Sequence, residues 1–394
     1  MKMKVVAIKS IADVSSGNTP SRRKSEYWNG SIPWITTGEL ESGYVTASKE
    51  CVTEKALKET ALKLYHKGTV LIAMYGQGKT RGTAAVLGIE ATVNQACAAL
   101  TVHSGCPKFL FYQLQNSYHA IRRLSNTGNQ ENLNVEIIKN FKILWPDELE
   151  QQKIATILST QDKVIELKEK LLAQKQQQKK YLMQQLLTGK LRLPDVNGEW
   201  TSVKLKELLI ERNEKNVEQN HRICSVAVSK GVVDQIEHLG RSYAAADTSN
   251  YGVAHYGDII YTKSPTGDFS LGIIKQNRMR ENVAISPLYG IYKPISFSTG
   301  YLLNIYFEST INTKNYLNPI VQKGAKNTIA ISNSAFLENK IFFPMDEATQ
   351  SRIAKVFELT DHEIDLLQKS IEAEKQKKKA LMQLLLTGKV RVKI

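Results

Sequence analysis

The chain has 394 residues, of which 42% are hydrophobic, and it carries a formal net charge of +15 at pH 7. This length predicts two or three domains. No apolar run approaches the roughly 20 residues of a membrane span, the first residues lack the long apolar core of a signal peptide, and the four cysteines show neither CxxC spacing nor a disulfide framework. We therefore expect a cytoplasmic protein that is neither membrane-spanning nor stabilised by disulfides.

Residues 1–146 are expected to form a mixed α/β module. The polar run SSGNTPSRRKSEYWNGSIPW at 15–34 carries three consecutive cations, and TVLIAM at 69–74 predicts a buried strand. That strand leads into a glycine-rich, cationic turn, YGQGKTR at 75–81, and an amide-rich loop, NTGNQENLN, follows at 126–134. The cationic and amide side chains of this module are therefore expected mostly in loops.

Most of the excess positive charge lies outside the predicted long helices. Residues 1–146 hold 18 Lys and Arg against 10 Asp and Glu, whereas residues 147–195 hold 9 against 7. A basic globular segment favours a polyanionic partner, with nucleic acid first. A basic surface without such a partner is the alternative that charge alone leaves open.

Residues 147–195 are expected to form a long helix. Leu158, Ile165 and Leu172 recur every seven residues with Glu, Lys and Gln between them, which is the spacing of a coiled coil. Gly189 follows the last apolar positions, where a left-handed C-terminal cap favours glycine. Forty helical residues would span roughly 60 Å, and a helix of that length with one apolar stripe needs a partner.

Residues 196–345 follow the plan of the first module with weaker similarity. The run YGDIIY at 256–261 parallels HKGTVL at 66–71, and TKSPTGDFS at 262–270 takes the place of the cationic turn. KGAKNTIAI at 323–331 takes the place of the amide-rich loop. Two modules with one plan and different loops would each recognise something different.

Residues 346–394 repeat the first helix without a gap. Tyr181–Leu193 (YLMQQLLTGKLRL) recurs as Ala380–Val392 (ALMQLLLTGKVRV) at a constant spacing of 199 residues. The recurring apolar stripe consists of Phe357, Ile364 and Ile371. Because duplicated stripes related by a two-fold axis are self-complementary, the two helices are expected to pair. The alternative is that each helix packs only on its own domain.

The expected fold class is α+β. Two mixed α/β modules, at 1–146 and 196–345, are separated by two long helices, at 147–195 and 346–394, that pair as an antiparallel coiled coil with a pseudo-two-fold internal repeat. VRVKI at the end of the chain copies LRLPDV, which leads into the second module. We therefore expect the C-terminal segment to return to the start of the first module.

Tests for catalytic chemistry favour a protein that recognises or joins other molecules. GQGKT at 76–80 falls short of a nucleotide-binding phosphate loop, because Ala73 stands where that motif needs glycine. The sequence contains no HExxH, GxSxG or GxGxxG motif, and its seven histidines are scattered. We expect no catalytic residues and no metal site. The turn favours a DNA contact, since Arg and Gln recognise base edges and Lys contacts phosphate. A plain surface turn is the alternative.

Several runs together resemble the specificity subunit of type I restriction–modification systems. They are GNTPSRR and YWNGSIPWI within 17–35, YGQGKTRG, VNQAC at 93–97, NTGNQENLN, and the duplicated helices with EQQKIATIL and LLTGK. The resemblance covers the whole chain, and the duplicated helix is its most specific part. The second module departs from the pattern, because it has no IPW and its amide-rich loop is divergent.

The resemblance implies a non-catalytic subunit with two target-recognition domains that recognise the halves of a split, asymmetric double-stranded DNA site. It implies that two methyltransferase subunits dock on the helices, and that two restriction subunits with motor and nuclease activity can join them. The complex would be an adenine-N6 DNA methyltransferase and ATP-dependent endonuclease. S-adenosylmethionine, ATP and Mg would be bound by the partners, so no cofactor is expected on this chain.

The candidate DNA-binding residues are polar and cationic side chains of the predicted loops. They are Thr19, Ser21, Arg22, Arg23, Lys24, Tyr75, Gln77, Lys79, Thr80, Arg81, Asn126, Asn129, Gln130, Asn132, Lys230, Lys263, Ser264, Thr266, Arg278, Lys323, Lys326 and Asn327. The expected helix-pair interface consists of Leu158, Ile165, Leu172, Phe357, Ile364 and Ile371. The main alternative is a coiled-coil scaffold protein whose modules bind protein partners, and it predicts weaker salt dependence than DNA binding does.

Overall fold

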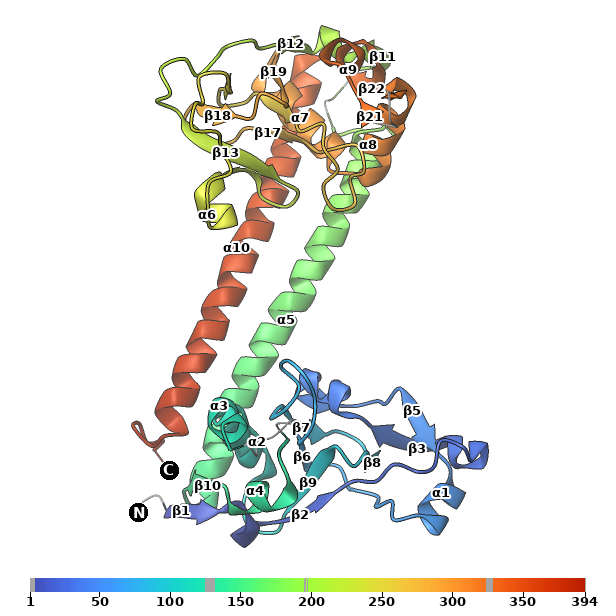
Figure 1. The fold of residues 1–394 in the computed structure, drawn as a ribbon, viewed down its shortest axis with the longest axis vertical. Helices are drawn as coiled ribbons and strands as arrows, with labels where there is room; N and C mark the ends of the chain where they lie inside the picture. The colour runs from blue at the N-terminus through green and yellow to red at the C-terminus, as the bar shows by residue number, and fades with distance from the viewer. Residues whose placement is uncertain (1–3, 125–131, 195, 197, 324–328, 394) are drawn as a thin grey trace. The chain divides into compact units, whose positions relative to one another are not determined.

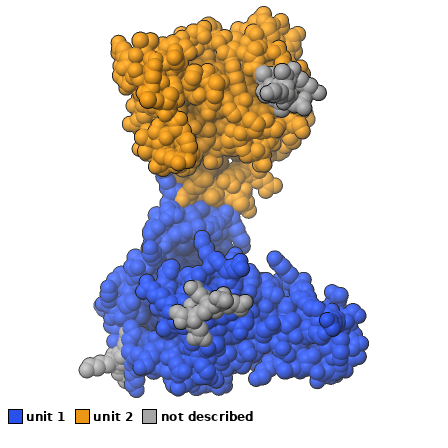
Figure 2. Space-filling view, in the orientation of Figure 1, with its two compact units in different colours: residues 1–170, 369–394 blue, residues 171–368 orange. Residues whose placement is uncertain are grey.

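The computed structural model describes residues 4–124, 132–194, 196, 198–323 and 329–393 (Figure 1). The chain divides into two compact units (Figure 2). Unit 1 contains residues 1–170 and 369–394, and unit 2 contains residues 171–368. Each unit therefore holds one module together with a segment of each long helix.

Unit 1 is built on a five-stranded sheet in the order β2-β9-β6-β7-β4. It also contains a three-stranded sheet in the order β5-β3-β8 and a two-stranded sheet, β1-β10. The strands are β1 (Lys4–Ala7), β2 (Ala12–Ser16), β3 (Trp28–Ile35), β4 (Tyr44–Val45), β5 (Glu50–Val52), β6 (Val70–Ala73), β7 (Ala84–Leu87), β8 (Thr92–Val93), β9 (Cys97–Val102) and β10 (Lys142–Trp145). The α-helices of the module are α1 (Glu54–Glu59), α2 (Pro107–Asn116), α3 (Tyr118–Arg122) and α4 (Val135–Asn140), and the 3-10 helices are Ile8–Ser10, Ser25–Tyr27 and Thr37–Ser42.

Unit 2 contains a four-stranded sheet, β12-β19-β16-β17, a second sheet, β14-β13-β18-β15, and the pairs β11-β22 and β20-β21. The strands are β11 (Trp200–Lys204), β12 (Leu209–Glu211), β13 (Arg222–Ala227), β14 (Gly231–Asp234), β15 (Gly252–Ala254), β16 (Ile259–Tyr261), β17 (Ile274–Gln276), β18 (Val283–Ile285), β19 (Gly290–Pro294), β20 (Gln322–Lys323), β21 (Ile329–Ala330) and β22 (Lys340–Pro344). The α-helices are α6 (Gln235–Leu239), α7 (Phe297–Phe307), α8 (Thr310–Leu317) and α9 (Asn333–Glu338), and the 3-10 helices are Leu205–Glu207 and Asn318–Ile320.

The two modules share one strand plan, as their sequences predicted. The order β2-β9-β6-β7 in unit 1 corresponds to β12-β19-β16-β17 in unit 2, and the pair β1-β10 corresponds to β11-β22. In both modules the second half of the plan is a hairpin, β6-β7 or β16-β17, whose connecting turn differs completely in sequence. The scaffold is therefore duplicated while the turns it carries are not.

The long helices α5 (Glu148–Leu186) and α10 (Glu347–Leu385) have 39 residues each, which corresponds to about 58 Å. Gly189 and Gly388 follow them with φ angles of 69° and 71°, in the left-handed region that glycine adopts without a Cβ penalty. The predicted C-terminal caps are confirmed. Helical structure ends three residues before each glycine, so the last part of each predicted long-helix segment is not helical.

The helix segments run antiparallel within each unit. In unit 1, Lys168 Nζ contacts Glu374 Oε1 at 2.8 Å and Lys378 Nζ contacts Asp162 Oδ1 at 2.5 Å. The contact that lies further along α10, at Lys378, is made to the residue that lies earlier in α5, Asp162, so the two segments run in opposite directions. In unit 2, Lys175 Nζ contacts Glu363 Oε2 at 2.8 Å. These pairs confirm the antiparallel arrangement that the duplicated stripe predicted.

The apolar stripe divides between two roles. Ile165 and Ile371 are buried in unit 1, while Leu172 and Ile364 are half-buried in unit 2. Leu158 and Phe357 are fully buried, and their clusters contain both module side chains and the end of the other long helix. Leu158 shares its cluster with Phe109 and Leu385, and Phe357 shares its cluster with Tyr301 and Leu186. The spacing of seven thus identified buried or half-buried positions on both helices.

Each module's core includes the end of a long helix. Leu385 and Leu386, from the LLTGK run of α10, belong to the cluster that contains Phe109 and Trp145 of the first module. Leu186 at the end of α5 and Leu187 just after it belong to the corresponding cluster of the second module, together with Trp200, Tyr301 and Phe336. The repeated LLTGK sequence is therefore explained by packing, since both copies fill the same place in equivalent cores.

The C-terminal segment returns to the first module, as expected (Figure 1). Arg391 pairs with the fully buried carboxylate of Glu150, and Lys153 Nζ donates to the carbonyl oxygen of Lys393 at 2.7 Å. Val392 and Val6 pack against the same hydrophobic cluster. No helix in the described part of the chain is long and apolar enough to cross a membrane.

We predict that Leu386→Ala destabilises the first module although it lies some 240 positions beyond that module's last strand. Removing this fully buried side chain should lower the free energy of unfolding by about 2–5 kcal/mol. The measurement is urea unfolding, with hydrogen exchange of the β6 and β9 amides to locate the effect. Leu384→Ala is the matched control, because Leu384 is 41% exposed and its loss should change stability by less than about 0.5 kcal/mol. Equal effects of the two substitutions would contradict the packing role.

Candidate nucleic-acid interface

Two of the predicted polar loops of unit 1 and the VNQAC run meet at one edge of the five-stranded sheet. β9 pairs antiparallel with both β2 and β6, so that Ser16 faces Ala98 and Ala73 faces Cys97. The ends of β2 and β6 therefore lie beside the start of β9. The cationic loop after β2, the turn after β6 and the VNQAC run before β9 consequently emerge together.

Hydrogen bonds join these loops to one another. Thr19 Oγ1 donates to Gln95 Oε1, and the backbone N–H of Met74 donates to the carbonyl of Ala96 at 2.7 Å. The N–H of Leu133 donates to the carbonyl of Met74 at 3.0 Å, which attaches the end of the amide-rich loop to the same place. Asn132 is half-buried beside this attachment. Asn126, Asn129 and Gln130 lie outside the described residues, so their role stays a prediction.

The β6-β7 turn presents polar side chains to solvent. Tyr75 is 40% exposed, Gln77 and Lys79 are exposed, and Thr80 is half-buried. Arg81 differs from the expectation, because its side chain is only 8% exposed. It faces the protein rather than solvent, so in this conformation the turn offers one open cation, Lys79, instead of two.

The cationic loop contains two side chains that are already engaged. Arg22 Nη1 and Nη2 bind both carboxylate oxygens of Glu50 at 2.5 and 2.8 Å, and its guanidinium lies 3.8 Å from the ring centroid of Trp28. The hydrogen bond to Glu50 raises the pKa of Arg22 and lowers the pKa of Glu50. Lys24 Nζ donates to Tyr27 Oη at 2.9 Å, which raises the pKa of Lys24.

The remaining cation of this loop, Arg23, is exposed, and the described structure records no ion pair for it. Ser21 is exposed as well, although its carbonyl oxygen accepts a hydrogen bond from Trp28 Nε1 at 3.2 Å. A phosphate contact at Arg22 would have to replace Glu50. Arg23 is therefore the simpler candidate for such a contact.

The second-module candidates whose side chains are described fall into two places. Lys263, Ser264 and Thr266 lie in the β16-β17 turn, which corresponds to the β6-β7 turn of the first module. Lys263 has a φ of 56° and is half-buried, and this burial lowers its pKa. Thr266 pairs with Phe269 across the turn, which is therefore internally tied.

The other two candidates, Lys230 and Arg278, line a separate cleft of about 610 Å³ within unit 2. The cleft also contains Lys275, Glu308 and Asp361, so its charge is mixed rather than uniformly positive. The sequence predicts Lys230 and Arg278 only as loop candidates for DNA contact, and the structure places both side chains at this cleft. The side chain of Lys323 is not described, and Lys326 and Asn327 lie outside the described residues.

A repeated polar junction connects each module to the long helices, and sequence reasoning assigned it no role. In unit 1, Tyr112 Oη donates to Asp162 Oδ2 at 2.7 Å, and Lys378 contacts the other oxygen of the same carboxylate. Burial, reinforced by the bond to the carboxylate, raises the pKa of Tyr112.

Unit 2 has the equivalent set in the same geometry. Tyr301 Oη donates to Asp361 Oδ2 at 2.7 Å, and Lys179 Nζ contacts Asp361 Oδ1 at 2.7 Å. Lys179 also contacts Glu308 at 2.7 Å. The signal was present in the sequence, because the Asp and the Lys both recur at the spacing of 199 residues. Among the described residues no group of three or more His, Cys, Asp and Glu is placed to hold a metal ion.

Comparisons with known proteins agree with this arrangement. Residues 1–176 match the family model described as the type I restriction modification DNA specificity domain. Over 172 residues the chain is 34% identical to the type I restriction enzyme MjaIX specificity subunit of Methanocaldococcus jannaschii, covering 42% of this chain and 39% of that protein. Over 151 residues it is 29% identical to the EcoR124I/EcoR124II specificity subunit of Escherichia coli, covering 37% of each. These matches span about two fifths of the length of either relative.

The whole chain is similar in fold to a solved structure. The crystal structure of a type I restriction–modification S subunit from M. genitalium aligns with a TM-score of 0.61 at 14% identity, covering 98% of this chain and 96% of that one. At this identity the likeness establishes the fold. It bears out the α+β architecture with two modules and two long helices.

The exposed turn and loop generate a prediction that separates two kinds of DNA contact. Arg23→Ala should weaken binding to specific and random duplexes alike and reduce the slope of log affinity against log salt by about one, because it removes one phosphate contact. Gln77→Ala should change base preference in one part of the target only, by about 1–3 kcal/mol. The measurement is titration of both variants on matched duplexes at several salt concentrations. Equal losses on specific and random DNA from Gln77→Ala would remove it from the base-recognising residues.

Proposed function

We propose that the chain is a specificity subunit of a type I restriction–modification system and that it recognises a split, asymmetric site on double-stranded DNA. The match of residues 1–176 to the DNA specificity domain, and the similarity to the MjaIX specificity subunit, support this proposal. Each module reads one half of the site. The observation that carries this proposal is the duplicated strand plan with unrelated turns at equivalent positions. One scaffold used twice with two different sets of side chains suits two different DNA sequences.

The chemistry of the first interface supports this function. Gln77 offers an amide that can bind adenine bidentately, while Lys79 and Arg23 supply positive charge for phosphates. Their loops lie at one edge of a single sheet, so base and backbone contacts can form together. In this proposal the chain carries out no chemical step, and its contribution is to place partner enzymes on a chosen sequence.

The partners in this proposal are methyltransferase subunits, two per chain, with or without two motor-nuclease subunits. The helices offer equivalent apolar positions for a partner that docks twice. Leu167 on α5 is 53% exposed and Leu366, its counterpart 199 residues later on α10, is 51% exposed. S-adenosylmethionine, ATP and Mg would be bound by those partner subunits, and the assembled complex would act in the cytoplasm.

The function is tested by selection from a pool of DNA duplexes with random sequence. The full chain, alone and with its methyltransferase partner, should enrich a motif in two parts separated by a spacer of fixed length. Affinity should fall steeply with salt, because several phosphates are contacted. Recovery of no motif, together with salt-insensitive capture of a protein by either module, would favour the coiled-coil scaffold alternative.

The helix pair is predicted to set the spacer length. Ile165→Ala removes a buried side chain from the pair in unit 1, at a cost of about 2–5 kcal/mol. The variant should tolerate spacers one base pair longer or shorter better than the parent does, because the linkage between two weak binders is softened. Competition between duplexes of different spacer lengths measures this. Ile157→Ala, at an exposed position of the same helix, is the control. If Ile165→Ala discriminates between spacer lengths as well as the parent does, the helix pair does not set the spacer length.

A second prediction concerns partner docking. Leu167→Glu and Leu366→Glu should each remove one methyltransferase subunit from the complex, and the double variant should remove both, since a buried carboxylate at an apolar interface is costly. Native mass spectrometry of the assembled complex counts the subunits. Leu288→Glu, at a residue exposed to 73% in the second module, is the control. A double variant that still holds two methyltransferase subunits would exclude these positions.

A further inference from the structure

The β6-β7 turn of the first module depends on glycine for its shape. Gly76, Gly78 and Gly82 have φ angles of 134°, 61° and 85°, which other residues rarely adopt. The hairpin is closed at its base, where the N–H of Gly82 donates to the carbonyl of Ala73 at 2.8 Å. Such a turn has many accessible conformations when nothing else holds it. Its exposed side chains can occupy fixed positions only if the backbone is braced from outside.

Helix α3 supplies that brace. Tyr118 Oη donates to the carbonyl oxygen of Lys79 at 2.7 Å, and Arg122 Nη1 donates to the carbonyl oxygen of Arg81 at 2.7 Å. The two braces also support each other, because Arg122 Nη1 lies 3.1 Å from Tyr118 Oη. Tyr118 and Arg122 are four residues apart and thus share one face of the helix. They hold the backbone of the turn at two points without using its outward side chains.

The fit between α3 and the turn is close. A Cβ atom added at Gly82 would lie 3.1 Å from Arg122 Cγ and 3.5 Å from Tyr118 Cδ2. Glycine at this position therefore serves the approach of the helix as well as the backbone angle. Helix α3 and the β6-β7 turn are therefore in close van der Waals contact as well as joined by hydrogen bonds.

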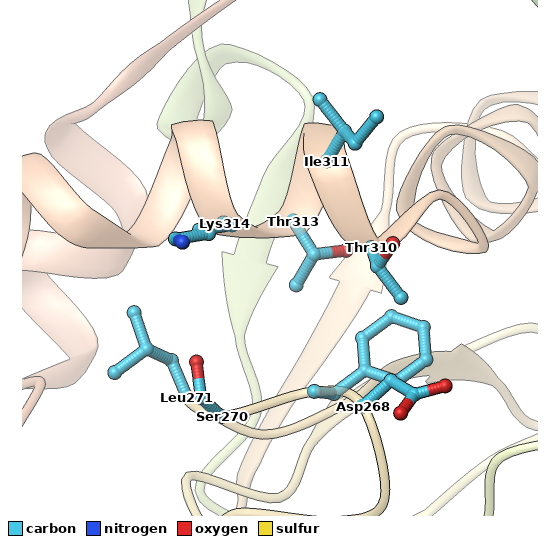
Figure 3. Close-up of a pocket in the computed structure, with 8 residues that line it drawn as sticks. Asp268, Ser270, Leu271, Thr310, Ile311, Thr313 and Lys314 are labelled. Carbon is cyan, nitrogen blue, oxygen red and sulfur yellow. The ribbon is translucent and has the colours of Figure 1, made fainter.

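The equivalent β16-β17 turn of the second module is separated from the neighbouring helix by a cavity. A cavity of about 170 Å³ lies between the β16-β17 turn, at Asp268–Leu271, and the first turns of α8, at Thr310–Lys314 (Figure 3). The turn is tied mainly to its own hairpin, where Tyr261 Oη donates to the carbonyl of Leu271 at 2.8 Å. Helix α8 follows α7 in the chain as α3 follows α2, and this cavity lies between α8 and the turn.

We propose that Tyr118 and Arg122 are positioning residues that set the sequence discrimination of the first module by fixing the backbone of the β6-β7 turn. The proposal rests on the proposed function, because it assumes that Gln77 and Lys79 face DNA. Neither Tyr118 nor Arg122 needs to touch a base. By holding the turn backbone in one conformation, they restrict the positions that the amide of Gln77 can occupy before it contacts a base edge.

The first test uses Tyr118→Phe in the full chain. This variant keeps the ring and loses one hydrogen bond to the turn. Selection from random duplexes should yield a two-part motif in which discrimination falls roughly three- to tenfold in one part, and this should be the same part that Gln77→Ala alters. Tyr181→Phe, at an exposed tyrosine of α5, should leave both parts intact.

The second test separates positioning from a direct phosphate contact. Arg122→Lys keeps the positive charge and loses the planar guanidinium, whereas Arg122→Gln loses both. If Arg122 positions the turn, both variants relax the same part of the motif and the salt slope on random DNA is unchanged in both. A slope lowered by about one in Arg122→Gln alone, with the motif intact in Arg122→Lys, would identify a phosphate contact and overturn the proposal.

Other results of these experiments would contradict either the proposed function or the role of Tyr118 and Arg122. Failure of the parent chain to enrich any motif would defeat the proposed function rather than the brace. An unchanged motif in Tyr118→Phe would defeat the brace alone. Loss of binding to all DNA with a lowered melting temperature, or relaxation of both parts of the motif, would show that the contact serves general stability and would also overturn the proposal.

Discussion

Neither module closes its hydrophobic core without the end of a long helix. The leucines of the two LLTGK runs are buried, and each pair lies in a cluster with aromatic side chains of a module, such as Phe109 in unit 1 and Tyr301 in unit 2. The position of each module is therefore tied to the helices by the strongest stabilising force available to it. A duplicated core requirement also explains why the helices kept their sequences while the turns diverged.

The polar junctions add geometric definition to that packing. Asp162 and Asp361 each bind a tyrosine from a module and a lysine from the antiparallel helix segment. Both carboxylates are half-buried, so removing one partner would leave a partly desolvated charge with fewer hydrogen-bond donors, which is destabilising. Apolar packing alone tolerates small sliding movements between helices, whereas a shared carboxylate accepts its donors in one register. The junctions thus fix which residues of the two helix segments face each other.

The sequence predicted the features that depend on repetition and local pattern. The spacing of 199 residues, the glycine caps and the duplicated strand plan all follow from residues near one another or related by the repeat, and the structure bears them out. Contacts between residues that lie far apart in the sequence could not be predicted from it. Arg22 looked like an open cation, because Glu50 stands 28 positions away and nothing local marks the pair.

The same limit applies to burial and to bracing. Arg81 and Lys79 have similar places in the sequence of the turn, yet only the side chain of Lys79 reaches solvent. Tyr118 and Arg122 belong to a helix whose sequence shows no relation to the turn it supports. For the loops, sequence therefore located the candidate interface but did not distinguish open side chains from engaged ones.

The path of the chain has a consequence for its synthesis. The last strand of the first module ends at Trp145, but Leu386 and Arg391, which complete that module's core and its ion pair with Glu150, are synthesised some 240 residues later. At a synthesis rate of roughly 5–20 residues per second, the intervening stretch takes on the order of 10–50 s. During that time the first module exposes apolar surface that invites aggregation or chaperone binding. A chain that stopped shortly before Leu385 would retain Phe357 in α10 yet leave the earlier-made module with an open core.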